Sequence, residues 1–270
     1  MITVYLQGGL GNQMFQIAST YSHAKKHGDE AMFNLNNSHT PHQGENSSKY
    51  KDTLLRGFEH RENIYDDCHK VFTQPGHSFC EIPYSTKQQL QGFYQSEKFF
   101  IDHKEELIEK FRLGLASPPY YFRWTKISSE LDKLRNNLGK PIVSIHIRRG
   151  DYLKFRGIHE PCTVEYYNTA MEIMEEKIGS FHAYFVSDDI EWCKEIFDGQ
   201  GSFSSYADEL DDLMLMVNSD HNIIANSSFS WWGSYLNINP NKVVIGPKKW
   251  FGPQGPQDTD DIIPNNWIKI

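Results

Sequence analysis

The chain has 270 residues, of which 39% are hydrophobic, so it is long enough for one large domain or two modest domains with buried cores. Its 27 basic and 35 acidic residues give a net charge of −8. This charge argues against general nucleic-acid binding, because phosphates require a positive face. Aromatic residues make up 14% of the chain, and sugar rings commonly lie on aromatic faces, although most aromatic residues belong to cores.

No run of residues reaches the roughly 18 apolar positions that a membrane helix needs. The first six residues lead into Gln7 and a glycine cluster without a basic region or a cleavage site, so they predict a strand rather than a signal peptide. The four cysteines show no ligand spacing, and we expect reduced thiols. The sequence therefore predicts a cytoplasmic protein, with peripheral contact to the inner face of the membrane left open.

Apolar, β-rich runs alternate with helical patterns along the chain, which is typical of an α/β protein. The first half predicts a strand at 2–6, a glycine turn at 8–11 and a helix at 12–26. A polar stretch at 34–49 then indicates a loop. Apolar residues recur on one face of a later helix, and we expect them in the core: Phe100, Leu107, Ile108 and Phe111.

The second half begins after a Ser-Pro-Pro break at 117–119 and a polar helix that runs to about residue 138. We therefore predict two halves, 1–138 and 139–270. The second half repeats a βα unit, which indicates a parallel sheet covered by helices on both faces. Its predicted strands are 142–147, 183–186, 222–225 and 243–245, and its helices are 163–177, 191–197, 210–217 and 228–236. Ligands bind such sheets at the carboxyl ends of strands, where the unusual motifs of this half fall.

The first motif joins His146, inside the strand at 142–147, to Arg148, Arg149 and Asp151 just beyond it. Two adjacent guanidinium groups repel each other unless an anion or carboxylates neutralise them, and a pyrophosphate matches their forked donors. Strand alternation places His146 on the same face as Arg148. We favour an anion site over the alternative, an internal Arg–Asp pair at a surface turn. A kinase-like interpretation fails, because the motif is accompanied by no kinase-type GxGxxG loop, no strand with the kinase lysine and no Asp-Phe-Gly sequence.

A second motif, Asn226, Ser227 and Ser228, follows the strand at 222–225 and precedes the helix that contains Phe229. Asn and Ser are helix-capping residues, and a helix N-terminus offers free N–H groups and a partial positive charge to an anion. The hydroxyls of Ser227 and Ser228 would add donors. The alternative is an ordinary capped helix with two core tryptophans, and the pattern alone does not decide between them.

The third motif, Asp188 and Asp189, ends another strand. Carboxylates at this position can accept hydrogen bonds from a base or ribose, and they can equally hold Mg²⁺. Because Asp189 is also placed to cap the following helix, we assign a functional role to Asp188 alone.

The fourth motif is glycine-rich and follows the first strand, from Gln7 to Gln13. It does not match the GxGxxG fingerprint, and no ribose-binding acid can be placed after it, so a dinucleotide loop is not expected. Glycines allow close approach of the backbone to another group, and Asn12 strengthens a functional interpretation.

These segments together resemble the α-1,2-fucosyltransferase family of bacteria and animals. The matching segments are 8–16, 146–152, 187–189 and 226–233, which span most of the chain in the family's order. The resemblance implies a GT-B fold, with two Rossmann-like halves and a cleft between them. It assigns the acceptor side to 1–138 and GDP-fucose binding to 139–270.

The resemblance also implies roles for individual residues. Arg148 and Arg149 stand where the family's arginine pair holds the donor pyrophosphate. Asn12 is implied at the reaction centre. The other implied donor-binding residues lie near the guanosine (His146, Asp188) or near the phosphates and base (Asn226, Ser227, Ser228, Phe229). Asp151 is the nearest candidate base, although we favour a role as an ion-pair partner of an arginine.

The function implied is transfer of L-fucose from GDP-β-L-fucose to the 2-hydroxyl of a terminal galactose on a glycan, with inversion. The expected partners are GDP-fucose and a galactose-terminated oligosaccharide. We expect no metal ion and no cofactor, because the arginines can neutralise the pyrophosphate themselves. Two other functions stay open: a transferase of different donor specificity, and a non-catalytic sugar- or GDP-binding module.

Overall fold

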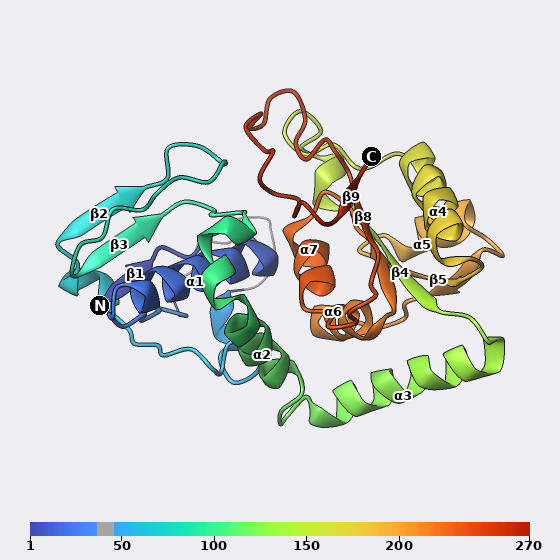
Figure 1. Ribbon diagram of the computed structural model, residues 1–270, viewed down its shortest axis with the longest axis horizontal. Helices are drawn as coiled ribbons and strands as arrows, with labels where there is room; N and C mark the ends of the chain where they lie inside the picture. Colours follow the sequence, from blue (N-terminus) through green and yellow to red (C-terminus); the bar gives the residue numbers. More distant parts are fainter. Residues whose placement is uncertain (37–45) are drawn as a thin grey trace. The chain divides into compact units, whose positions relative to one another are not determined.

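The computed structural model describes residues 1–36 and 46–270, so most of the predicted loop at 34–49 lies outside the described residues. The chain forms two compact units. Unit 1 contains residues 1–117 and 258–264, and unit 2 contains residues 118–257 and 265–270. Each unit has its own parallel sheet, and the chain is α/β as predicted (Figure 1). The division differs from the predicted one at 138/139, because the polar helix before residue 138 belongs to unit 2.

Unit 1 is built on three parallel strands in the order β1-β3-β2. The strands are β1 (Ile2–Val4), β2 (Lys70–Thr73) and β3 (Gln88–Gln91), and the helices are α1 (Leu10–Lys26) and α2 (Lys104–Leu115). Helix α1 begins two residues before the predicted start, so Gly11 is helical rather than part of the turn. The predicted core residues on and before α2 are buried: Phe100, Leu107, Ile108 and Phe111.

Unit 2 contains a six-stranded parallel sheet in the order β6-β5-β4-β7-β8-β9. Its strands are β4 (Ile142–Ile147), β5 (His182–Ser187), β6 (Gly201–Phe203), β7 (His221–Ile223), β8 (Val244–Gly246) and β9 (Ile268–Lys269). Its helices are α3 (Tyr121–Leu138), α4 (Val164–Ile178), α5 (Ile190–Ile196), α6 (Glu209–Asn218) and α7 (Ser228–Tyr235). Numbered within the unit, the strands follow the 3-2-1-4-5-6 order of a doubly wound Rossmann sheet.

Helices cover both faces of this sheet, α4 and α5 on one side and α6 and α7 on the other (Figure 1). All six residues of β4 are buried, which explains its nearly continuous apolar sequence. Val143, Ile145 and Ile147 share a hydrophobic cluster with residues of α4 and α5. The alternate residue His146 faces α7 instead, where its ring packs against Phe229.

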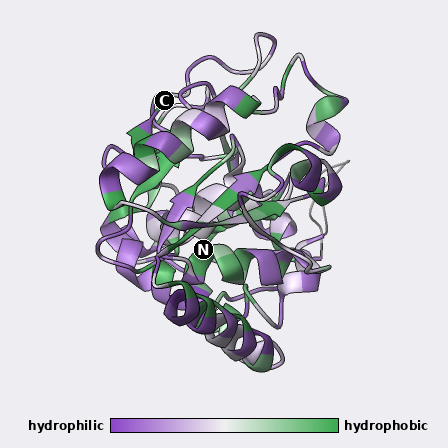
Figure 2. Ribbon diagram, turned by 90° about the vertical axis from the view of Figure 1, so that its right-hand side faces the viewer, coloured by the Kyte–Doolittle hydropathy of each residue, from purple (hydrophilic) through white to green (hydrophobic). Residues whose placement is uncertain are grey.

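Helix α3 is attached to the rest of unit 2 mainly by ion pairs, because few of its side chains are buried in a core. Of its residues only Ile127 and Leu131 are buried, and Figure 2 shows mixed hydrophilic and hydrophobic colours along this helix. Arg123 binds Asp208 and Asp211 at the start of α6, with Nη1 2.8 Å from the Asp208 carboxylate. These contacts account for the position of the unit boundary before α3. Within the described residues, no helix combines the length and apolarity that a membrane crossing requires.

Candidate active site

The strand order of unit 2 determines where a ligand site is expected. From β4 the chain builds outward through β5 and β6, and it then returns to place β7 on the opposite side of β4. Ligands of doubly wound sheets bind outside the carboxyl ends of the strands at this reversal. The motif of Arg148 and Arg149 leaves β4 there, and the motif of Asn226 to Ser228 leaves β7. The topology therefore brings together two motifs that lie far apart in the sequence.

Three carboxylates surround the two arginines. Nη1 of Arg148 lies 3.1 Å from Asp188, and its Nη2 lies 2.6 Å from Asp151. Nε of Arg149 donates to Asp189 at 3.0 Å. Burial lowers the pKa of Arg148, but the neighbouring Asp188 and Asp151 carboxylates outweigh this and raise it, so the group stays charged. The internal Arg–Asp pair that the sequence offered as an alternative is thus present.

An anion site and these ion pairs are compatible. A guanidinium carries five N–H donors, and these contacts use only some of them in each arginine. Asp151 forms an ion pair with Arg148, which is the role that we favoured for it from the sequence. Asp189 is the N-cap residue of α5, as its position in the sequence suggested, but its side chain makes no capping bond and accepts from Arg149 instead. The carboxylates therefore fix the orientation of the two forks.

Aromatic rings support the same two arginines. Cζ of Arg149 lies 3.8 Å from the ring centroid of Trp192 on α5, and Cζ of Arg148 lies 5.5 Å from that of Tyr152. Both distances are within the roughly 6 Å range of cation–π attraction. The Tyr152 hydroxyl donates to the Asn226 carbonyl at 2.9 Å, so this ring also connects the end of β4 to the end of β7.

Asp188 holds the turn that follows β4. One of its oxygens accepts from the Arg149 backbone N–H at 2.9 Å, while the other faces Arg148. A Cβ at Gly150 would lie 2.5 Å from this carboxylate, so the glycine is required for the close approach. The contacts give Asp188 a positioning role, and its contact with a guanine base or ribose stays a prediction.

His146 is buried, and its ring centroid lies 5.8 Å from that of Phe229. Burial, with a smaller contribution from the Arg148 charge, lowers the pKa of His146 to about 3. The imidazole is therefore neutral near pH 7, and its Nδ1 has no hydrogen-bond partner among the described residues. It can exchange a hydrogen bond with a ligand, but it adds no positive charge to the site.

Helix α7 begins at Ser228, and its first turn receives no capping hydrogen bond from the side chain of the N-cap residue. The N-cap residue is Ser227, and its hydroxyl does not make the capping bond that the sequence suggested. The N–H groups of this turn therefore keep their anion-binding capacity. Ser227 is buried, whereas Ser228 and Phe229 are partly exposed. Trp231 and Trp232 are buried, which confirms their expected place in the core.

Asn226 has a structural task that the sequence did not reveal. Its Nδ2 donates to the carbonyls of Glu160 and Trp250 at 2.9 and 2.8 Å, and its Oδ1 accepts from the Cys162 thiol at 3.4 Å. These bonds connect the loop after β4 with the segment after β8. These contacts give the Asn226 amide a positioning role, and its direct contact with the donor stays a prediction.

In unit 1 the glycine-rich motif forms a tight loop between β1 and α1. Gly8 has a φ of +77°, and a Cβ there would lie 2.4 Å from Nδ2 of Asn12, so other residues are excluded by both strain and space. Gln13 donates from Nε2 to the Gly8 carbonyl at 2.8 Å. Asn12 accepts from Gln95 at 2.6 Å. Asn12 is thus held in a fixed orientation, and its role at the reaction centre stays a prediction.

Sequence reasoning missed the contacts of Tyr152 and Trp192 with the arginines, and it did not identify Arg149 as the partner of the Asp189 side chain. Tyr152 lies inside the 146–152 motif, so an aromatic ring four residues after Arg148 was the available signal. Trp192 follows the acidic pair by three residues, within the first turn of α5. Neither spacing alone specifies contact with a guanidinium.

The whole chain, residues 1–270, matches the model of glycosyl transferase family 11. It belongs to this family. Two relatives from Escherichia coli match over nearly their full lengths. The "Alpha-1,2-colitosyltransferase" is 31% identical over 300 residues, covering 100% of this chain and 99% of the relative. The "O-antigen biosynthesis glycosyltransferase WbnK" is 28% identical over 312 residues, covering 98% and 99%.

A more distant relative of this glycosyltransferase is the human "Galactoside alpha-(1,2)-fucosyltransferase 1". It is 24% identical over 261 residues, covering 87% of this chain and 65% of the relative. The predicted membership in the family of fucosyltransferases is therefore confirmed at the level of the family.

Proposed function

We propose that this glycosyltransferase moves L-fucose from GDP-β-L-fucose to the 2-hydroxyl of a terminal galactose, giving Fucα1-2Gal. The observation that carries the proposal is the arginine pair at the strand reversal, adjacent to the open N-terminus of α7. Together they offer guanidinium forks and backbone N–H groups to a pyrophosphate. The choice of fucose and galactose is supported by the four matching segments and by the name of the human relative.

The proposed reaction is a single in-line displacement. The acceptor oxygen forms a bond to the anomeric carbon as that carbon's bond to the β-phosphate oxygen breaks, which converts a β-linked donor into an α-linked product. GDP leaves with the electron pair, and its growing negative charge is stabilised by Arg148 and Arg149. The hydroxyl proton leaves late, to water or to a phosphate oxygen of GDP, so a strong protein base is not required.

We also propose that the reaction needs no metal ion. Asp188 and Asp189, the carboxylates that could bind Mg²⁺, are both paired with arginines. The two guanidinium groups can then carry the charge stabilisation that a cation would otherwise supply. Turnover is expected to continue at an unchanged rate in excess EDTA. Loss of turnover in EDTA with recovery on adding Mn²⁺ or Mg²⁺ would reassign these aspartates to metal binding.

Transfer of colitose is a second candidate, because a relative that is 31% identical over the full chain is named as a colitosyltransferase. Colitose is the 3-deoxy form of L-fucose, so the two donors differ by one hydroxyl. A site that hydrogen-bonds this hydroxyl would reject the deoxy sugar strongly, whereas a site without a partner for it would accept both.

A donor screen tests these alternatives. GDP-fucose, GDP-colitose, GDP-mannose and UDP-galactose are each incubated with lactose and the purified protein, and products are identified by NMR. The proposal expects turnover with GDP-fucose and an α1-2 linkage. A preference for GDP-colitose supports the second candidate, and a β linkage contradicts the inverting mechanism. Saturable GDP binding without transfer of any sugar would instead indicate a binding module.

A further inference from the structure

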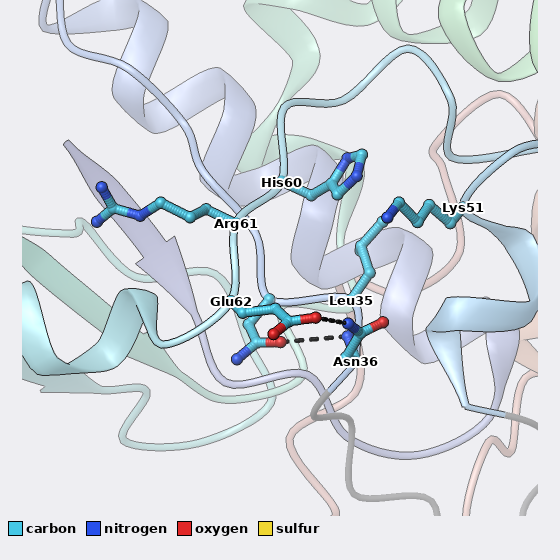
Figure 3. Close-up of a pocket in the computed structure, with 7 residues that line it drawn as sticks. Leu35, Asn36, Lys51, His60, Arg61 and Glu62 are labelled. Carbon is cyan, nitrogen blue, oxygen red and sulfur yellow. Dashed lines mark hydrogen bonds between the residues drawn. The ribbon is translucent and has the colours of Figure 1, made fainter.

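Unit 1 contains a polar cavity of about 210 Å³ that none of the motifs reaches. Among the residues that the structure describes, the cavity is lined by apolar Leu35 and by six polar residues: Asn34, Asn36, Lys51, His60, Arg61 and Glu62. In Figure 3 the Lys51 side chain and the His60 ring lie on the same side of the cavity near Leu35, whereas Arg61 extends away from them. The cavity therefore presents a mixture of hydrogen-bond donors and acceptors beside a small apolar surface.

The cavity lies at the carboxyl edge of the sheet of unit 1. Beyond β1 the sheet continues through two further parallel bridges, Ile2 with Ala31 and Phe33 with His60. The lining residues 34–36 follow the bridged Phe33, and the lining residues 60–62 begin at the bridged His60, as the glycine-rich loop follows β1. Carboxyl ends of neighbouring parallel strands meet at one edge of a sheet, and this edge is where α/β folds bind ligands. The cavity and the loop that holds Asn12 thus share one edge.

The charges around the cavity are balanced. Arg61 forms an ion pair with Asp67, and Glu62 accepts a hydrogen bond from Asn36 at 2.5 Å. Lys51 supplies one further positive charge. Within residues 1–36 and 46–270 the Glu62 carboxylate makes no ion pair, so an anionic ligand in the cavity would meet an unpaired negative charge. At the arginine pair of unit 2, by contrast, each of the three carboxylates is engaged by a guanidinium.

Amide, carboxylate, imidazole and ammonium groups suit a ligand rich in hydroxyls, because each hydroxyl donates one hydrogen bond and accepts others. We propose that this cavity binds a neutral sugar residue of the acceptor glycan. The inference rests on the proposed function, since it assigns the acceptor to unit 1. Glu62 and Lys51 act as acceptor and donor to sugar hydroxyls, and Leu35 contacts the carbon face of the ring.

Two variants test the cavity, Glu62→Gln and Lys51→Met, with Lys70→Met as the matched control. Lys70 is exposed on β2, lies outside the cavity lining and carries the same charge as Lys51. Each variant is assayed for transfer to lactose, and GDP affinity is measured by calorimetry. We expect the two cavity variants to raise KM for lactose about tenfold or more, as loss of a hydrogen bond to a charged partner does. KM for the donor, GDP affinity and the control variant should stay unchanged.

Direct binding separates this inference from the proposed function. Saturation-transfer NMR with lactose is recorded on the full-length protein and on both cavity variants, whichever donor the enzyme uses. Loss of the lactose signal in Glu62→Gln supports the cavity even if GDP-fucose proves to be the wrong donor. Wild-type signal and KM in both variants, with thermal melting showing a folded protein, overturn it. Stronger binding of galacturonic acid than of galactose would also overturn the assignment to a neutral sugar.

Discussion

The carboxyl edges of the two sheets can be compared directly. In unit 2 the charged side chains are held on several sides: Arg149 meets a carboxylate at its Nε and an indole ring on its face. In unit 1 the polar side chains around the cavity are mostly exposed, and the Lys51 ammonium makes no hydrogen bond or ion pair within 1–36 and 46–270. A leaving pyrophosphate gains most from charges fixed in advance, because no reorganisation is then needed during the reaction. Recognition of a neutral glycan tolerates side chains that adapt.

The comparison predicts its largest effect at Arg148. Arg148→Ala should lower kcat on the order of 10² or more, because the change removes transition-state stabilisation and leaves Asp151 and Asp188 uncompensated. The measurement is steady-state transfer from GDP-fucose to lactose. Arg123→Ala is the control, since it also leaves two carboxylates unpaired in unit 2 but far from the motifs in sequence. Near-full turnover in a folded Arg148→Ala protein would remove the phosphate assignment.

Arg149 tests whether fixed geometry matters beyond charge. Arg149→Lys keeps the positive charge but loses the fork and the close stacking on Trp192, so we expect a loss of about 10- to 100-fold in kcat/KM. Trp192→Leu should lower the same parameter less, about tenfold, while the charge remains. Because both changes act on one guanidinium, the double variant should be no worse than Arg149→Lys alone. Fully additive losses would show that Trp192 acts by another route.

Asp151 distinguishes a positioning carboxylate from a general base. Asp151→Asn should lower kcat about tenfold by loosening Arg148, and the acidic limb of the pH profile should remain. Titration of His146 should not affect the pH profile of kcat between pH 5 and 8, because its lowered pKa of about 3 keeps the imidazole neutral in this range. The check is a pH series of kcat for both proteins. A loss of about 10³-fold with normal donor binding and no acidic limb would identify a lost base.

The smallest expected effects distinguish donor binding at the sheet of unit 2 from acceptor binding at the sheet of unit 1. Ser228→Ala should weaken GDP-fucose binding a few-fold and leave KM for lactose unchanged, because its hydroxyl lies at the start of α7 in unit 2. Replacement of the loop at 34–49 should change acceptor preference and leave GDP affinity unchanged. Calorimetry with GDP and a panel of galactosides measures both. Equal effects on GDP affinity would contradict the division of substrates between units.

The sequence predicted some elements to the residue and others not at all, and the difference is physical. The apolar run at 142–147 specified β4 because a parallel strand covered on both faces needs apolar residues throughout. Strands β2 and β3 escaped detection because their sequences, KVFT and QQLQ, are short and largely polar. Their pairing depends on neighbours that the local sequence does not contain.

The site shows the same division. Motifs at strand ends were found, because strand-end placement follows from the alternation of elements along the chain. The ring contacts of Arg148 and Arg149 and the three hydrogen bonds of the Asn226 side chain were not found. These contacts join side chains to residues on other loops and helices. Their separation along the chain follows no regular pattern, so only the three-dimensional structure reveals them.

The segment Asp258–Pro264, which belongs to unit 1, limits how this protein can be dissected or rebuilt. Asp258 accepts backbone hydrogen bonds from His77 and Ser78, and Asp261 accepts one from Phe79. The chain then re-enters unit 2 to form the edge strand β9. A single cut therefore cannot yield two intact units, and deleting the last dozen residues would strip hydrogen bonds from both. Chimaeras that exchange acceptor specificity between relatives should carry this segment together with residues 1–117.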